Sequence, residues 1–191
     1  MKNWKLSRKI TLGITLIVIV CMSLLYVTAN RTLKGIMQES ERNNMKSILV
    51  AQSSLIEEYV TSQESLLKAY SKTPAVIALL KDVNSADKQK TAQAYTEYYY
   101  KGLDNWEGIY IGEWNTHVIA HSNPAVVGMV TREGDSLKAL QDAMTSSDGL
   151  YDAGIIVSPA SGKLILSMYC PVYDANETTI LGYVGGGPFV V

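Results

Sequence analysis

The sequence predicts an α+β protein in which an N-terminal transmembrane helix is followed by a long amphipathic helix that packs on a five-stranded antiparallel sheet. Three observations predict this fold: an uncharged apolar segment, a run of helical periodicity, and a series of short alternating apolar runs between turn residues. We therefore divide the chain into a cytoplasmic N-terminus (1–9), a transmembrane helix (10–29), a long helix (30–73), a helical linker region (74–106) and a sheet domain (107–191).

The composition excludes several classes of protein. The chain has 191 residues and a net charge of -1, and no basic stripe follows residue 10, so nucleic acid is not an expected partner. Cys21 lies in the apolar segment and Cys170 in a predicted strand, so we expect no disulfide between them. No CxxC or similar spacing marks a metal site, and we expect neither a metal nor a cofactor.

The apolar segment from Ile10 to Ala29 is long enough to cross a bilayer as a helix and contains no charged residue. Basic residues precede it at Lys2, Lys5, Arg8 and Lys9. Only Arg31 and Lys34 follow it closely. By the positive-inside rule, the N-terminus should stay in the cytoplasm and the chain after residue 30 should lie outside.

A cleaved signal peptide is the alternative for this segment, because Val27-Thr28-Ala29 resembles a small-residue cleavage site. The apolar core is longer than a usual signal-peptide core, and the helical pattern continues past it without a break. We therefore favour a retained anchor. In both cases the rest of the chain is exported.

A long amphipathic helix is predicted from Arg31 to Lys72, which contains no proline and one glycine, Gly35. Its apolar residues recur mostly at steps of three, four and seven. We expect the membrane-proximal part to pair with a second copy of the chain in a homodimer, and the distal part to pack on the sheet. The alternative is an interruption near Arg42-Asn43-Asn44, where the apolar stripe lapses.

The linker region begins at Pro74, which either ends the long helix or opens the next one. We expect a short helix over residues 75–81, a polar loop from Asp82 to Lys90 and a further helix from Thr91 to Tyr100.

Five strands are predicted in the sheet domain from alternation and turn residues. Their ranges are 108–114, 117–121, 149–158, 163–173 and 180–190. A helix from Asp135 to Met144 separates the second strand from the third, with Asp135 as its expected N-terminal cap. Gly185-Gly186-Gly187 lies in a strand rather than before a helix, so it predicts no phosphate loop; we expect it to let a helix or a ligand approach the sheet closely.

This order of elements resembles the PAS-like Cache sensor module that lies outside the membrane in bacterial methyl-accepting chemotaxis proteins and sensor histidine kinases. The segments that carry the resemblance are Gly108–Ile111, Trp114–Gly128, Arg132–Asp135, Ser158–Gly162 and Gly182–Gly187. It covers nearly the whole chain, and the order of the motifs persuades more than any one of them.

The resemblance implies a single-pass receptor of the bacterial cell membrane with an extracytoplasmic sensor domain, most readily a chemoreceptor, with a histidine kinase as the alternative. Receptors of this kind continue into a second membrane helix, a HAMP relay and a cytoplasmic output module. This chain stops at Val191 without them. We therefore expect a fragment, a truncated gene product, or a sensor that signals through a partner.

A small-ligand pocket is expected between the sheet and the segment from Ser122 to Asp135. The candidate ligand-binding residues are Tyr110, Trp114, His121, Arg132, Asp152 and Tyr169. Alternation places the aromatic residues of the first strand on the pocket face and its isoleucines toward the long helix. The twelve tyrosines, against one phenylalanine, suit a half-wet pocket because each combines an apolar ring with a hydroxyl.

Two charged residues would define the ligand. Arg132 is expected to bind a carboxylate through its guanidinium, and Asp152 is expected to meet an ammonium group. A zwitterion such as an amino acid needs both, whereas a simple carboxylate needs only the arginine.

Each candidate also has a structural interpretation. Arg132 and Glu133 could form a solvated pair, the aromatic residues could belong to the core, and Asp152 could cap a turn. His117 and His121, on one strand, would lie about 13 Å apart, too far for one metal.

Two other functions stay open. An exported enzyme is disfavoured because no pairing of a nucleophile with a base is evident. An extracellular interaction module, its pocket filled by side chains, is the other alternative.

Overall fold

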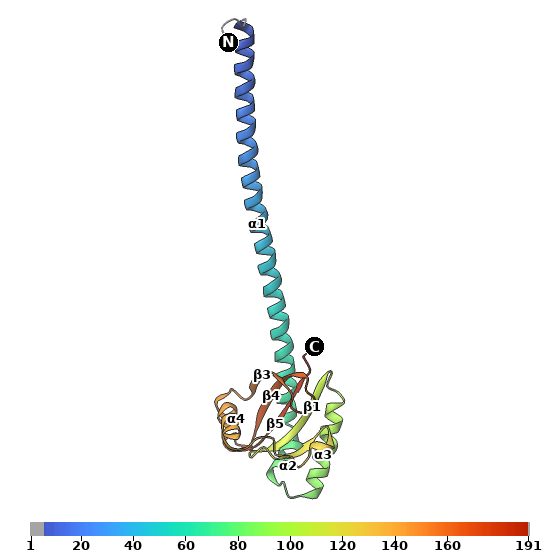
Figure 1. The fold of residues 1–191 in the computed structure, drawn as a ribbon. Coiled ribbons are helices and arrows are strands. Elements are labelled where there is room, and N and C mark those ends of the chain that lie inside the picture. Colours follow the sequence, from blue (N-terminus) through green and yellow to red (C-terminus); the bar gives the residue numbers. More distant parts are fainter. Residues whose placement is uncertain (1–5, 191) are drawn as a thin grey trace. The chain divides into compact units, whose positions relative to one another are not determined.

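A computed structural model describes residues 6–190 of the chain (Figure 1). The helices are α1 (Leu6–Ser71), α2 (Pro74–Lys81), α3 (Ala86–Tyr100) and α4 (Gly134–Ser146), with a short 3-10 helix, η1, at Pro124–Val126. The strands are β1 (Trp106–Glu113), β2 (Val118–His121), β3 (Tyr151–Val157), β4 (Leu164–Tyr173) and β5 (Ile180–Pro188). The predicted α+β class is confirmed.

Helix α1 passes from one compact unit of the chain into another. The first unit ends at Glu57 and the second begins at Glu58 and includes the sheet. The part of α1 in the first unit contains one segment long and apolar enough to cross a membrane. Residues 1–5, which belong to the predicted cytoplasmic N-terminus, lie outside the described residues.

The long helix is continuous, and the alternative interruption near Arg42 does not occur. The helix ends at Ser71, whose hydroxyl donates a hydrogen bond to the carbonyl oxygen of Lys68. Pro74 then occupies the first turn of α2, where a proline costs no helical hydrogen bond. The sequence had left open whether Pro74 ends one helix or begins the next, and it begins the next.

Two predicted helix starts require correction. Helix α3 begins at Ala86 rather than Thr91, because the polar residues after Ser85 continue the helix on its solvent side. Helix α4 begins at Gly134, and Glu133 occupies the capping position predicted for Asp135. Asp135 instead lies in the first turn, where a negative charge interacts favourably with the helix dipole without capping it.

The sheet is antiparallel throughout and has the strand order β2-β1-β5-β4-β3. All five strands agree with the sequence prediction to within two residues at either end. The first strand ends at Glu113, which leaves Trp114 in the turn. The outer edge of β2 is covered by Gln93 of α3. Its side-chain amide donates to the carbonyl oxygen of His121 at 2.8 Å and accepts from the His121 amide at 3.1 Å.

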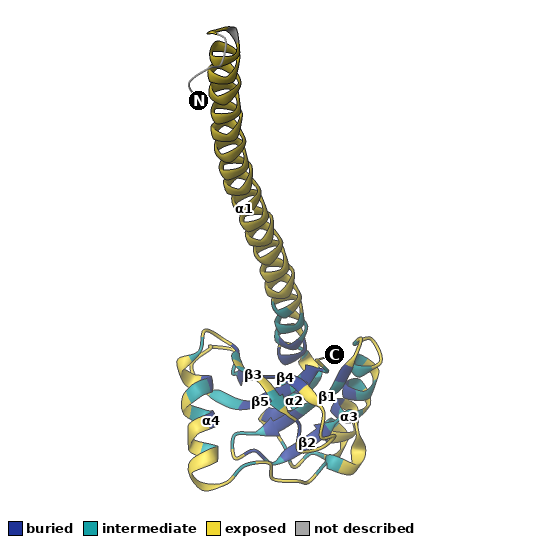
Figure 2. Ribbon diagram, turned by 45° about the horizontal axis from the view of Figure 1, so that its top comes forward, coloured by how far each residue is buried: buried dark blue, intermediate teal, exposed yellow. Residues whose placement is uncertain are grey.

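One face of the sheet forms the main hydrophobic core with the end of α1 and with α2 and α3. Ile109 and Ile111 are fully buried there, in the same cluster as Leu67 and Tyr70 of α1. Figure 2 shows that α1 becomes buried only in its last turns. The isoleucines of β1 therefore face the long helix, as alternation along the strand predicted.

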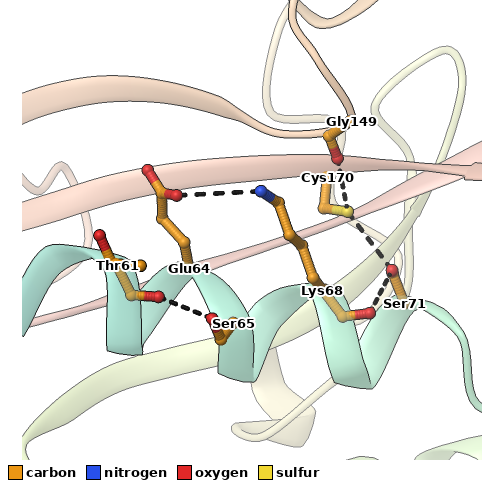
Figure 3. A network of polar contacts seen from close by, with 7 residues as sticks. All are labelled: Thr61, Glu64, Ser65, Lys68, Ser71, Gly149 and Cys170. Atoms are coloured by element: carbon orange, nitrogen blue, oxygen red, sulfur yellow. Dashed lines mark hydrogen bonds and ion pairs between the residues drawn. The ribbon is translucent and has the colours of Figure 1, made fainter. Parts of the chain in front are cut away.

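A small polar network joins α1 to β4 at the edge of this core (Figure 3). The buried Cys170 thiol lies 3.3 Å from the hydroxyl oxygen of Ser71 and 3.1 Å from the carbonyl oxygen of Gly149. The loop before β3, strand β4 and the last turn of α1 are thereby held at one point. In the core nearby, the hydroxyls of Tyr70 and Thr96 are hydrogen-bonded at 2.6 Å.

Candidate functional site

A pocket of about 570 Å³ lies on the other face of the sheet. Its walls come from the loop after β2, the beginning of α4 and the turn between β3 and β4. Four predicted ligand-binding residues, from three strands and the loop, line it: Tyr110, His121, Arg132 and Tyr169. The structure thus brings together four side chains that are up to 59 positions apart in the sequence.

A single row of residues crosses all five strands, and three of its members, His121, Tyr110 and Tyr169, line the pocket. The pairing of the strands places them in the order His121, Tyr110, Gly185, Tyr169 and Tyr151. The rings of Tyr110 and His121 stack at 5.5 Å between centroids, and those of Tyr151 and Tyr169 at 6.1 Å. Burial raises the pKa of Tyr110 well above its ordinary value, so its hydroxyl stays protonated.

Arg132 provides the positive charge of the pocket. Its Nη2 donates a hydrogen bond to the hydroxyl of Tyr169 at 3.2 Å, and its guanidinium carbon lies 5.8 Å from the centre of the Tyr169 ring. The hydrogen bond to Tyr169 raises the pKa of Arg132, which therefore remains charged. Arg132 takes part in none of the ion pairs found within residues 6–190, and it therefore forms no ion pair with Glu133.

The backbone of Arg132 is fixed by Thr116, a residue that the sequence did not single out. The Thr116 hydroxyl donates to the Arg132 carbonyl oxygen at 2.8 Å and accepts from the Arg132 amide at 3.0 Å. Thr116 is fully buried and has a φ of 65°, which is an uncommon conformation for a β-branched residue. The two hydrogen bonds from this buried turn hold the backbone of Arg132 in a defined position.

His121 presents a neutral imidazole. Its Nδ1 accepts a hydrogen bond from the amide of Asn123 at 2.8 Å, which leaves the proton on Nε2. Burial lowers the pKa of His121 below its ordinary value. The bonds from Gln93 to its backbone hold the residue in place, so that Nε2 can donate a hydrogen bond to a bound molecule.

Glu107 also lines the pocket, and sequence analysis missed it. It lies at an irregularity in the pairing of β1 with β5: Trp106 pairs with Pro188 and Gly108 with Gly187, so Glu107 is the extra residue of a β-bulge. Its Oε1 is buried and has no hydrogen-bond partner in the described part of the chain. A bulge reverses the alternation along a strand, and no pattern of apolar residues in the sequence announces it.

Trp114 and Asp152 are not among the pocket-lining residues. Trp114 packs against a small cluster of buried residues, Leu140, Met144, Tyr169 and Tyr183. Its carbonyl oxygen accepts a hydrogen bond from Gln141 at 2.8 Å. Asp152 is exposed, and its Oδ1 accepts a hydrogen bond from the amide of Gly154 at 2.7 Å, which agrees with the turn-capping alternative. Ligand contact by these two residues stays a prediction without support from the pocket geometry.

His117 lies away from the pocket and contacts Glu113, with 2.6 Å between Nδ1 and Oε2. Within residues 6–190, no three His, Cys, Asp or Glu side chains come close enough to hold a metal ion together.

The fold can be compared with known proteins. No family model and no curated protein matches the sequence. The sensor domain of the V. cholerae histidine kinase DctB is similar in structure, with a TM-score of 0.60 and 16% identity, over 76% of this chain and 54% of that one.

A second similar structure is the ligand-binding domain of the Campylobacter jejuni chemoreceptor Tlp3 in complex with 4-methylisoleucine. Its TM-score is 0.52 at 18% identity, over 73% of this chain and 54% of that one. The chain thus spans about half the length of these two structures. Its fold is that of the Cache-type, PAS-like sensor domains of chemoreceptors and histidine kinases, as the sequence resemblance implied.

Proposed function

We propose that this chain is the membrane-anchored, extracytoplasmic sensor part of a signal-transduction receptor, and that it binds a small molecule such as an amino acid or a carboxylate. The observation that carries the proposal is the charge that Arg132 brings to the pocket. Its guanidinium lines a pocket without a carboxylate partner in the described part of the chain. A partly desolvated guanidinium that is held in place is a strong site for a carboxylate, which it can bind through two hydrogen bonds.

The size and lining of the pocket support a small ligand. A volume of about 570 Å³ falls within the range typical of small-molecule sites. Apolar side chains such as Val118, Ile156, Ile165 and Phe189 line it beside the polar groups. A ligand with an anionic end for Arg132 and a small apolar part satisfies both features.

The structure gives no support to the alternative of an exported enzyme. Within residues 6–190, neither histidine is hydrogen-bonded to a serine, threonine or cysteine side chain. The Cys170 thiol is buried in the core face of the sheet, and burial raises its pKa, which disfavours the reactive thiolate. The similar structures are sensor and receptor domains.

A chemoreceptor is our first candidate for the class of receptor, and a sensor histidine kinase is the second. Both classes are represented among the similar solved structures. In either class, α1 would serve as the membrane anchor through its apolar segment and as the dimerisation helix through the exposed apolar residues that follow it.

A route for the signal is provided by β4. Tyr169 lines the pocket on one face of this strand, and the next residue, Cys170, contacts Ser71 at the end of α1 on the other face. A ligand that moves Arg132 and Tyr169 would therefore shift β4 against α1. Shifts of about 1–2 Å between packed elements are common in such switches.

The proposal is tested by thermal unfolding of the full chain in detergent, with L-amino acids, acetate, propanoate and succinate added one at a time. A molecule that binds only the folded state must raise the melting temperature. We expect at least one of these carboxylates to do so by several degrees at saturation.

Two variants locate the binding. Arg132→Ala should abolish the stabilisation, whereas Lys138→Ala, which removes an exposed cation of α4 outside the pocket, should leave it unchanged. If no carboxylate stabilises a cooperatively unfolding wild-type chain, the proposal fails, and the interaction module becomes the better interpretation.

A further inference from the structure

We propose that Glu107 forms an ammonium-binding subsite in the pocket, so that the ligand carries an amine as well as a carboxylate. This inference builds on the proposed function and makes it more specific. It assigns to Glu107 the role that the sequence had suggested for Asp152.

The first argument is the backbone at Glu107. Gly108 and Tyr110 line the pocket, and in a regular strand the residue before Gly108 would point to the opposite face of the sheet. The bulge between Trp106 and Gly108 removes this constraint, and Glu107 lines the pocket together with its neighbour. Bulges are frequent next to functional sites because they redirect a side chain in this way.

The second argument is the unsatisfied Oε1 of Glu107. This carboxylate oxygen is buried, and it has no hydrogen-bond partner among residues 6–190. Buried polar atoms are nearly always paired, since leaving one unpaired costs folding free energy. Because Glu107 lines the pocket, a small rotation of its carboxylate would bring this oxygen to a cationic donor that enters with the ligand.

The third argument is that no cation of the protein takes this place. Glu107 belongs to none of the ion pairs within residues 6–190. The nearby His121 accepts a hydrogen bond at Nδ1 and is therefore neutral. Arg132, the cation that lines the pocket, bonds to Tyr169 instead.

The pocket thus contains a cation and an anion, neither of which belongs to an ion pair within the described residues. A zwitterion such as an α-amino acid supplies the complement to both, with its carboxylate at Arg132 and its ammonium at Glu107. A simple carboxylate would leave Glu107 unpaired. We therefore infer that amines with a carboxylate are the preferred ligand class.

The test compares L-leucine with 4-methylpentanoate, which has the same carbon skeleton without the amine. Corresponding pairs are L-alanine with propanoate and L-phenylalanine with 3-phenylpropanoate. Dissociation constants are measured by calorimetric titration of the full chain in detergent. We expect at least one amino acid to bind the wild type about tenfold to a hundredfold more tightly than its deamino analogue, as expected for a hydrogen bond to a charged group.

Glu107→Gln should remove this preference. The variant should bind the amino acid more weakly than the wild type does, and it should bind the deamino analogue equally well or more tightly. Glu113→Gln is the matched control, because Glu113 lies on the same strand, bonds to His117 and does not line the pocket. If Glu107→Gln fails to fold, Glu107→Asp takes its place: it keeps the negative charge but draws it back by one methylene, and it should reduce the affinity for the amino acid more than the affinity for the deamino analogue.

The outcomes separate the two proposals. Equal affinity for both members of every pair in the wild type, or an amine preference that survives in Glu107→Gln, overturns the ammonium subsite. If Arg132→Ala then still abolishes binding, the carboxylate sensor stands. If none of these probes binds the wild type, both proposals fall.

Discussion

Tyr110 and Gly185 are paired across β1 and β5, and the ring of Tyr110 occupies the space that a side chain at position 185 would need. A Cβ atom at Gly185 would lie 2.5 Å from both Cζ and the hydroxyl oxygen of Tyr110. The glycine therefore makes room for an aromatic ring that lines the pocket. From the sequence we expected a helix or a ligand to approach this run of glycines. At Gly185, the group that approaches is the side chain of Tyr110 on the neighbouring strand.

The first prediction concerns Gly185→Ala. The added methyl must displace the Tyr110 ring, so we expect a loss of about 1–3 kcal/mol in the free energy of unfolding and weaker ligand binding. Denaturant unfolding and ligand titration measure the two effects. Gly102→Ala is the control, because the nearest atom to its Cβ would be the Tyr99 carbonyl oxygen at an ordinary 3.5 Å. An unfolding free energy for Gly185→Ala equal to that of the control would contradict the packing described.

The second prediction concerns the support of Arg132. Thr116→Val keeps the shape of the side chain but removes both hydrogen bonds to the Arg132 backbone, so we expect a loss of about 1–3 kcal/mol in stability and weaker carboxylate binding. Thr116→Ser retains the hydroxyl and should bind like the wild type. Calorimetric titration with the carboxylate that binds most tightly makes the comparison. Equal binding by the valine and serine variants would show that Thr116 does not position the guanidinium.

The third prediction is a pH dependence of stability from His121. Burial lowers the pKa of this histidine in the folded state, so the unfolded chain binds the proton more readily. Its contribution to stability is complete above the ordinary pKa of 6.5 and is lost as the pH falls through the lowered value. The slope from this one group cannot exceed about 1.4 kcal/mol per pH unit.

The measurement is the free energy of unfolding between pH 8 and pH 5. His121→Gln should flatten the decline seen at low pH. His117→Gln leaves His121 in place and should retain that part of the decline. A steeper decline in His121→Gln than in the wild type would reverse the sign and refute the assignment of a neutral, buried imidazole.

The fourth prediction concerns the junction of β4 and α1. The Cys170 thiol is buried and hydrogen-bonded, and burial raises its pKa, so it should react with a thiol reagent only when the chain unfolds. In a Cys21→Ser chain, the rate of labelling then reports the opening of this junction. We expect labelling to be slow in the native chain and fast in denaturant. Fast labelling under native conditions would mean that α1 is not held against β4.

The fold could be predicted largely from the sequence because its signals are local. The alternation in β1 predicted which face carries Tyr110 and which carries Ile109, and the structure agrees. The helix boundaries were less accurate, since polar residues such as those after Ser85 fit a loop and an exposed helix equally well.

The pocket could be predicted only where alternation holds. Tyr110 and Tyr169 lie in regular strands, and Arg132 was found as the cation of the loop that covers them. Glu107 was missed because a bulge turns it to the other face. Asp152 was chosen by its charge, although its side chain bonds to the local backbone of Gly154, a contact that spacing alone does not reveal.

Hydrogen exchange of the full chain, with and without the carboxylate that binds most tightly, tests the central claim most directly, because it locates the ligand. The account predicts that exchange slows in the segment from Ser122 to Ser136, which covers the pocket and carries Arg132. It also predicts that Arg132→Ala removes this protection. Protection confined to another region, such as the shallow groove beside Tyr98 and Leu103, would contradict the claim that the pocket under Arg132 is the sensor site.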